Sequence, residues 1–133
     1  MKCVPLILLL SLLGGAGCQS QRRISIRNVS GADACITWKI KEDSVNASPF
    51  FISLSDSTTL TLRSRPPHHL MKMSFGTGSW TPSYLQAVSN DLDLLEIRYR
   101  AGLIRLEHPD SIAAFLLPRR RSIDKSQIRI VLR

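Results

Sequence analysis

Short runs in which apolar and polar residues alternate dominate the chain from residue 23 onward. Successive side chains of a β-strand point to opposite faces, so such a run predicts a strand with one buried face. Turn-forming residues interrupt the runs about every ten residues, which favours an antiparallel β-sandwich or barrel. The apolar members of the eight runs are Ile24 and Ile26; Ile36, Trp38 and Ile40; Phe50, Ile52 and Leu54; Leu60 and Leu62; Met71, Met73 and Phe75; Leu95, Ile97 and Tyr99; Ile104 and Leu106; and Ile128, Ile130 and Leu132.

Two short helices interrupt this pattern in the second half of the chain. Thr81 followed by Pro82 is typical of a helix N-cap, and we expect a helix from there to about Ser89. Asp110 is expected to cap a second helix over residues 111–117, ended by Pro118. The sequence therefore predicts an all-β domain, an antiparallel β-sandwich with one or two short helices.

Two segments of the first half carry a resemblance to known folds. An Ile-x-Ile strand ends in Asn-x-Ser-Gly at residues 24–31, and Ser-Asp-Ser-Thr-Thr-Leu-Thr-Leu follows at residues 55–62. This pattern resembles immunoglobulin-like and transthyretin-like sandwiches. The resemblance implies an architecture and no activity, because such folds host unrelated functions.

The first residues have the composition of a secretory signal. Lys2 precedes an apolar stretch at residues 4–13, which is too short to span the roughly 30 Å of a bilayer core as a helix. The following Gly15-Ala16-Gly17-Cys18 resembles the lipobox of bacterial lipoproteins, although Gly15 stands where that family usually has Leu. The resemblance implies acylation of Cys18 and a signal peptide at residues 1–17. The polar residues that follow predict a tether at 18–22, and the alternation that begins after them predicts one domain at 23–133.

The cysteines leave one alternative open. If Cys3 departs with the signal and Cys18 carries lipid, Cys35 is the only remaining thiol and no internal disulfide forms. Cleavage by ordinary signal peptidase upstream of Cys18 would instead allow a bridge between Cys18 and Cys35. Gln19 and Ser20 lack the acidic residue that favours inner-membrane retention in the lipoproteins that the chain resembles. The expected location is therefore the outer membrane, with the domain facing the periplasm.

Positive charge is the main chemical feature of the expected mature chain. The chain has 18 basic and 10 acidic residues, and removal of residues 1–17 takes away only Lys2 among them, so the net charge falls from +8 to +7. Outside the cytoplasm this charge meets lipid headgroups and acidic proteins, so we expect no nucleic-acid partner. Arg119, Arg120 and Arg121 form the densest run and are candidates for contact with an anionic surface. A solvated loop is the alternative interpretation of such a run.

A second candidate site combines imidazole and thioether groups at His68, His69, Met71 and Met73. Soft sulfur ligands bind Cu(I) and imidazole binds copper in either oxidation state, so the segment could form a copper site. Met residues at alternate strand positions are also ordinary core residues, and Phe75 continues the same face.

No motif in the sequence indicates an enzyme. Glycines of a nucleophile elbow, a phosphate-binding loop and a dinucleotide fingerprint are all missing, and we expect no cofactor. Two sequons, at Asn28 and Asn46, are interpreted as turn residues because the signal is bacterial in character. We therefore expect a lipid-anchored envelope protein whose small β domain binds or assembles with another envelope component. A periplasmic copper-binding module is the alternative.

Overall fold

The computed structural model describes residues 20–42 and 57–133. Within these residues the chain is mostly β, with seven strands in two sheets and two short α-helices. The elements, in chain order, are β1 (Gln21–Asn28), β2 (Ala34–Ile40), β3 (Ser57–Leu62), β4 (Leu70–Thr77), α2 (Pro82–Asn90), β5 (Leu92–Tyr99), β6 (Gly102–Leu106), α3 (Pro109–Leu116), the 3₁₀-helix η2 (Leu117–Arg119) and β7 (Gln127–Leu132). The strand expected around Phe50, Ile52 and Leu54 lies outside the described residues.

One sheet has the strand order β4-β1-β7 and the other has the order β3-β2-β5-β6. Pairing is antiparallel throughout except between β1 and β7, which are parallel and pair Arg23 with Gln127 and Ile26 with Ile130. The expectation of a purely antiparallel arrangement is therefore wrong at this pair. The C-terminal strand obtains its hydrogen bonds from the first strand, and the connection between these parallel strands includes all the elements from β2 to η2.

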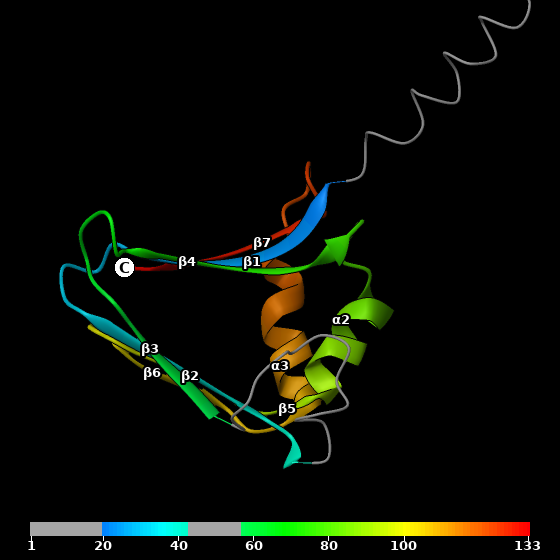
Figure 1. The fold of residues 1–133 in the computed structure, drawn as a ribbon, viewed down its shortest axis with the longest axis horizontal. Helices are drawn as coiled ribbons and strands as arrows, with labels where there is room; N and C mark the ends of the chain where they lie inside the picture. The colour runs from blue at the N-terminus through cyan, green and yellow to red at the C-terminus, as the bar shows by residue number, and fades with distance from the viewer. Residues whose placement is uncertain (1–19, 43–56) are drawn as a thin grey trace, which may run out of the picture.

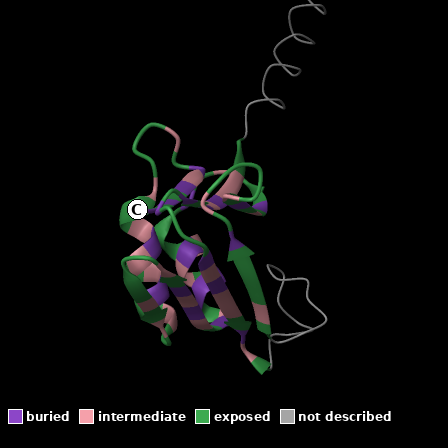
Figure 2. Cartoon of the chain, turned by 90° about the vertical axis from the view of Figure 1, so that its left-hand side faces the viewer, coloured by how far each residue is buried: buried purple, intermediate pink, exposed green. Residues whose placement is uncertain are grey.

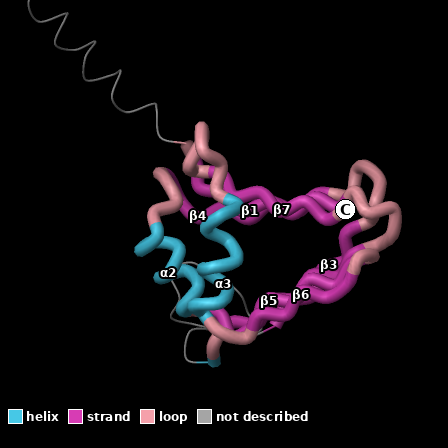
Figure 3. The backbone as a smooth tube through the Cα atoms, turned by 180° about the vertical axis from the view of Figure 1, so that it is seen from behind, coloured by secondary structure: helices cyan, strands magenta, loops and turns pink. Residues whose placement is uncertain are grey.

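The two sheets approach each other at one end and diverge at the other, where α2 and α3 lie between them (Figure 1). The same arrangement is visible from behind, with both helices at the open end (Figure 3). Helices fill this end because the sheets alone cannot bury their inner faces where they separate.

Alternation places the expected apolar residues in the core. Four strand isoleucines, Ile24, Ile26, Ile36 and Ile97, are at most 4% exposed. The residues that alternate with them along β1, β2 and β5 face outward. Figure 2 shows this alternation of buried and exposed residues along the strands. Trp80 is fully buried and packs edge-on against Phe75 and Tyr84, with ring centroids 5.3 and 5.7 Å apart. These rings join β4 to α2.

The predicted start of α2 is confirmed. Thr81 is its N-cap, and the Thr81 hydroxyl accepts a hydrogen bond from the backbone N–H of Tyr84 at 3.2 Å. The start of α3 is different from the expectation, since His108 occupies the N-cap position and Asp110 lies in the first turn. Pro109 explains the earlier start, because proline is well tolerated at the first helical position. The Asp110 side chain accepts a hydrogen bond from Gln86 of α2 at 3.0 Å.

Candidate anion-binding face

The outer face of the β4-β1-β7 sheet is built around the first strand. Ile24 and Ile26 face the core, so the strand turns Arg23, Ser25 and Arg27 outward. Arg23 and Arg27 therefore lie on either side of the small Ser25 along the strand, each about 7 Å away by strand geometry.

The neighbouring strands place two further cations across the sheet from Ser25. Lys72 of β4 is the antiparallel partner of Ser25, and Arg129 of β7 is its parallel partner. Adjacent strands lie about 4.8 Å apart. Four cationic side chains thus surround one hydroxyl, two along β1 and two across it. We name Arg23, Arg27, Lys72 and Arg129 the basic cross.

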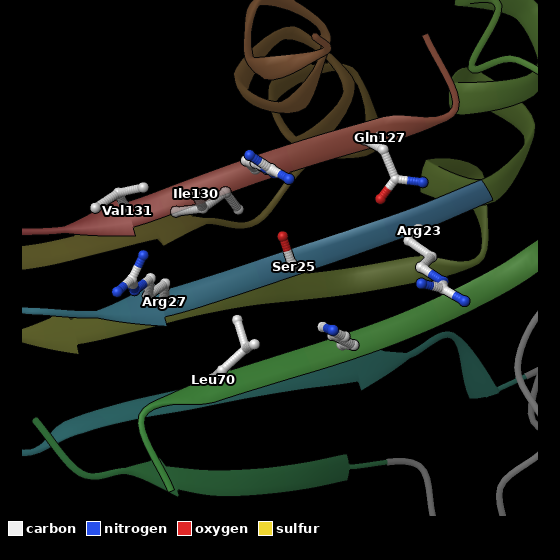
Figure 4. Close-up of a pocket in the computed structure, with 9 residues that line it drawn as sticks. Arg23, Ser25, Arg27, Leu70, Gln127, Ile130 and Val131 are labelled. Carbon is white, nitrogen blue, oxygen red and sulfur yellow. The ribbon is translucent and has the colours of Figure 1, made fainter. Parts of the chain in front are cut away.

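A shallow groove of about 320 Å³ runs over the basic cross. Ser25 forms its centre, because a serine side chain is too short to fill the space between the longer cations (Figure 4). No acidic residue contributes to the lining. The lining residues are Arg23, Ser25, Arg27, Leu70, Lys72, Gln127, Arg129, Ile130 and Val131.

One end of the groove is partly apolar. The register places Leu70 and Val131 on either side of Arg27, and these two side chains are 37% and 45% exposed. The opposite end is polar, with Ser74 and Gln127 on either side of Arg23. The groove therefore has a direction, from a polar end near the start of β1 to an amphipathic end.

Two arginines on the outer face of the other sheet form ion pairs with glutamates. Glu96 of β5 forms ion pairs with Arg98 at 3.6 Å and with Arg105 at 2.5 Å, and Glu107 pairs with Arg105 at 2.6 Å. Hydrogen bonds to Glu107 and Glu96 raise the pKa of Arg105 above its ordinary value. Among residues 20–42 and 57–133, no ion pair includes a member of the basic cross. Positive charge is thus gathered around Ser25 without an ion-pair partner in this part of the chain, although Arg129 interacts at longer range with the Asp124 carboxylate.

The chemistry of the groove is that of anion binding. Three of its four cations are arginines, whose planar fork matches a carboxylate or phosphate with two parallel hydrogen bonds. The Ser25 hydroxyl donates a hydrogen bond of 3.4 Å to the carbonyl oxygen of Ile128. This long bond leaves the hydroxyl oxygen available as an additional polar contact at the groove floor.

The three consecutive arginines expected to contact an anionic surface are separated by the structure. Arg119 stacks on the Phe115 ring at 3.7 Å and donates to the Phe115 carbonyl oxygen. Arg120 is half-buried and donates to the Trp80 carbonyl oxygen at 2.7 Å. Arg121 is exposed. None of the three lines the groove.

The four residues of the expected copper segment also have different environments. Met71 is 7% exposed and belongs to the core, and Met73 packs against it beside Phe75. His68 is exposed, whereas His69 is half-buried with its Nδ1 atom buried and without a hydrogen-bond partner. Within the part of the chain that the structure describes, no group of three or more His, Cys, Asp or Glu side chains could hold a metal ion. The copper site remains a prediction.

Asn28, the first sequon asparagine, is fully buried, and its amide donates to the carbonyl oxygens of Ala32 and Leu62. The interpretation as a turn residue agrees with this role. Asn46 and Cys18 lie outside the described residues. Cys35 is a half-buried free thiol on β2.

Sequence reasoning identifies the arginines of β1 as outward-facing but does not group them with Lys72 and Arg129. The available signal is the Arg-Ile-Ser-Ile-Arg pattern at residues 23–27, which places two cations around a small residue on one strand face. The other two cations join them only through pairing with β4 and β7.

None of the helices in the described ranges combines the length and the apolar character needed to cross a membrane. Comparisons of the chain with protein-family models, with curated proteins and with solved structures find no match.

Proposed function

We propose that the protein is a lipid-anchored component of the bacterial cell envelope that binds an anionic group of another envelope component through its β4-β1-β7 sheet. The observation that carries this proposal is the basic cross around Ser25, four cations over a groove with no acidic lining residue. Like charges without an ion-pair partner on one face destabilise a fold, so a groove of this kind favours a binding role. Binding requires only this surface, and we propose no catalytic activity.

The position of the N-terminal strand determines how closely an anchor at Cys18 would hold the domain. β1 begins at Gln21, and the Ser20 carbonyl oxygen accepts a hydrogen bond from the Gly78 N–H at 2.9 Å. The sheet therefore includes two residues assigned by sequence to the tether. Cys18 lies two residues before Ser20, so an anchor there holds this end of the domain within about 7 Å of the acylated residue.

The alternative disulfide between Cys18 and Cys35 is disfavoured by distance. Cys35 lies beside the opposite end of β1, because Asn28 contacts Leu62 and Leu62 pairs with Ala34. β1 has eight residues and spans about 25 Å. Two residues of chain cover about 7 Å, whereas a disulfide needs Cα atoms no more than about 7 Å apart.

The anchor also sets the proposed location. Gln19 and Ser20 follow Cys18 without an acidic residue, which supports the outer membrane with the domain in the periplasm. In fold terms we propose a variant of the β-sandwich in which α2 and α3 hold the sheets apart at one end. The parallel β1–β7 pair distinguishes it from a purely antiparallel immunoglobulin-like or transthyretin-like sandwich.

Mass spectrometry of the N-terminal peptide tests the anchor. The expected result is a lipid-sized mass increment on a peptide that begins at Cys18. A disulfide between otherwise unmodified Cys18 and Cys35, seen as a mass lower by two hydrogen atoms, would contradict the anchor.

Calorimetric titration tests the basic cross with two defined probes, inorganic pyrophosphate and a hexaglutamate peptide. The double variant Lys72→Gln and Arg129→Gln removes two cations of the cross. Its matched control, Lys39→Gln and Arg98→Gln, removes one lysine and one arginine from the outer face of the other sheet. Both variants have the same net charge, so a nonspecific attraction would weaken equally in the two.

The expected result is a loss of about tenfold in affinity for at least one probe in the first variant, with the control close to the unmodified protein. The probe with the stronger effect distinguishes phosphate from carboxylate ligands. Equal losses in the two variants would contradict a specific site.

A further inference from the structure

The loop between η2 and β7 carries the most exposed of the large apolar side chains in the described ranges. Ile123 is 93% exposed. Arg121 and Lys125 are both exposed on the same loop. An exposed isoleucine between two cations combines an apolar side chain with positive charge, which is the composition of a segment that contacts an anionic bilayer.

Hydrogen bonds to neighbouring residues hold the conformation of this loop, residues 121–125. The Asp124 carboxylate accepts hydrogen bonds from the Ser126 N–H at 3.1 Å and from the Ser126 hydroxyl at 2.5 Å. The Trp80 N–H donates to the Lys125 carbonyl oxygen at 2.8 Å, and the Arg121 N–H donates to that of Gln127 at 2.9 Å. The one acidic group of the loop is thereby directed toward Ser126, and Ile123 projects from a defined backbone.

The loop lies beside the point where the N-terminal segment enters the fold. Ser20, Ile123 and Lys125 border one hollow on the surface, together with Gly78 and Ser79. The loop and the start of β1 rise side by side from the same end of the sheet (Figure 1). Because only Gln19 separates Ser20 from Cys18, a lipid on Cys18 brings this end within about 7 Å of the acylated residue. The headgroup layer on each side of the hydrocarbon core is itself roughly 5–7 Å thick.

We propose that the 121–125 loop is a second membrane contact, which inserts Ile123 at the headgroup boundary of an anionic bilayer and places Arg121 and Lys125 on lipid phosphates. This inference rests on the proposed anchor at Cys18. Lipid and loop together form a two-point attachment, which stabilises one orientation of the domain. β1 extends away from this attachment. Arg27 and the amphipathic end of the groove lie near its far end.

Fluorescence quenching by brominated lipids tests the contact. Ile123→Trp places an indole at the loop, and Leu103→Trp is the matched control. Leu103 is 51% exposed on β6, whose hairpin lies near the opposite end of β1, since Arg100 donates to the Ser30 carbonyl oxygen at 3.2 Å. The native Trp80 is fully buried, and Trp38 contributes equally to both variants. Each full chain is purified from membranes and reconstituted into phosphatidylglycerol vesicles brominated on the upper acyl chain.

The expected result is quenching of the Ile123→Trp variant by about twofold, with much weaker quenching of the control variant. Adding Arg121→Ser and Lys125→Ser to Ile123→Trp should reduce the quenching toward that of the control. Equal quenching of the two tryptophan variants overturns the proposal. Tryptophan emission of the Ile123→Trp variant that changes with protein concentration but not with lipid bromination also overturns the proposal. That result would indicate that the loop contacts a second copy of the chain.

The N-terminal mass is read from the same preparation, so failure of the anchor is distinguished from failure of the loop. If the lipid increment is missing and the chain is uncleaved, apolar residues 4–13 still bring it to the bilayer. If the chain is cleaved without acylation, it is added to the vesicles from solution, and quenching of Ile123→Trp still reports on the loop.

Discussion

The side-chain amide of Asn28, at the end of β1, donates a hydrogen bond of 2.9 Å to the carbonyl oxygen of Leu62, at the end of β3 in the other sheet. The same amide donates to the Ala32 carbonyl oxygen at 2.8 Å, and its oxygen accepts from the N–H and hydroxyl of Ser30. One fully buried side chain thus closes the turn between the sheets where they meet.

Replacing Asn28 with Ala should lower the free energy of unfolding by about 3 kcal/mol, because the buried Leu62 carbonyl oxygen and the buried Ser30 N–H lose their partner. Denaturant unfolding measures the loss. The control is Asn90→Ala at the exposed end of α2, where the change should stay within about 0.5 kcal/mol. Similar effects of the two substitutions would contradict the role of Asn28.

Lys72→Gln should raise the melting temperature slightly at low ionic strength, because it relieves repulsion within the basic cross. The expected gain is a few tenths of a kcal/mol and should vanish in high salt. Arg105→Gln should change stability in the opposite direction, since that arginine pairs with Glu96 and Glu107. A stability loss in Lys72→Gln that persists in salt would give Lys72 a structural role.

Within the Arg119–Arg121 run, substitution by Ala should affect stability differently at Arg120 and at Arg121. Arg120→Ala should cost about 1–2 kcal/mol, because it removes the charge-assisted hydrogen bond to the Trp80 carbonyl oxygen. Arg121→Ala should change stability by less than about 0.5 kcal/mol, because its side chain is exposed. Thermal unfolding of the two variants checks the order, and a larger effect at Arg121 would reverse this assignment.

Asp124 should make the loop sensitive to acid. Hydrogen bonds from the Ser126 side chain and backbone lower the pKa of Asp124 below its ordinary value, with smaller contributions from Arg121 and Arg129. A carboxyl group with a lowered pKa in the folded state stabilises the fold above its unfolded pKa, about 3.9, and loses this effect as the pH falls through the folded value. Asp124→Asn should therefore melt below the unmodified protein at pH 7.

The difference between the two melting temperatures should close progressively below about pH 4. Melting curves between pH 2 and pH 7 measure it. A difference that stays constant over this range would assign the effect of the substitution to packing and not to the charge of Asp124.

Met71→Leu tests the copper alternative. Met71 is buried in the core, so the substitution should change stability by less than about 1.5 kcal/mol. Titration with Cu(I) in the presence of a competing chelator should show no retained copper in either protein. Copper retained by the unmodified protein and lost in Met71→Leu would establish the metal site instead.

The local pattern of the sequence predicts much of the fold because strand faces and helix caps depend on neighbouring residues. Alternation at Ile24 and Ile26 places Arg23, Ser25 and Arg27 on the outside without any knowledge of the partner strands. Thr81 and Pro82 likewise mark the start of α2.

Strand pairing could not be predicted in the same way. β7 pairs with β1 across about a hundred residues of chain, and its parallel direction depends on the crossover between them. The basic cross depends on this pairing, because Lys72 and Arg129 meet around Ser25 only when β4 and β7 flank β1. The sequence also could not show that the Arg119–Arg121 run is divided by the fold, since Arg119 and Arg120 are directed to different partners.

The central claim is that the basic cross binds another envelope component, and purification of the acylated protein from membranes tests it most directly. Three proteins are compared under the same salt conditions: the unmodified chain, Lys72→Gln with Arg129→Gln, and the charge-matched Lys39→Gln with Arg98→Gln. The account predicts that one component is retained in fixed proportion by the unmodified chain and the control, and lost from the first double variant. Equal retention by all three proteins would contradict it.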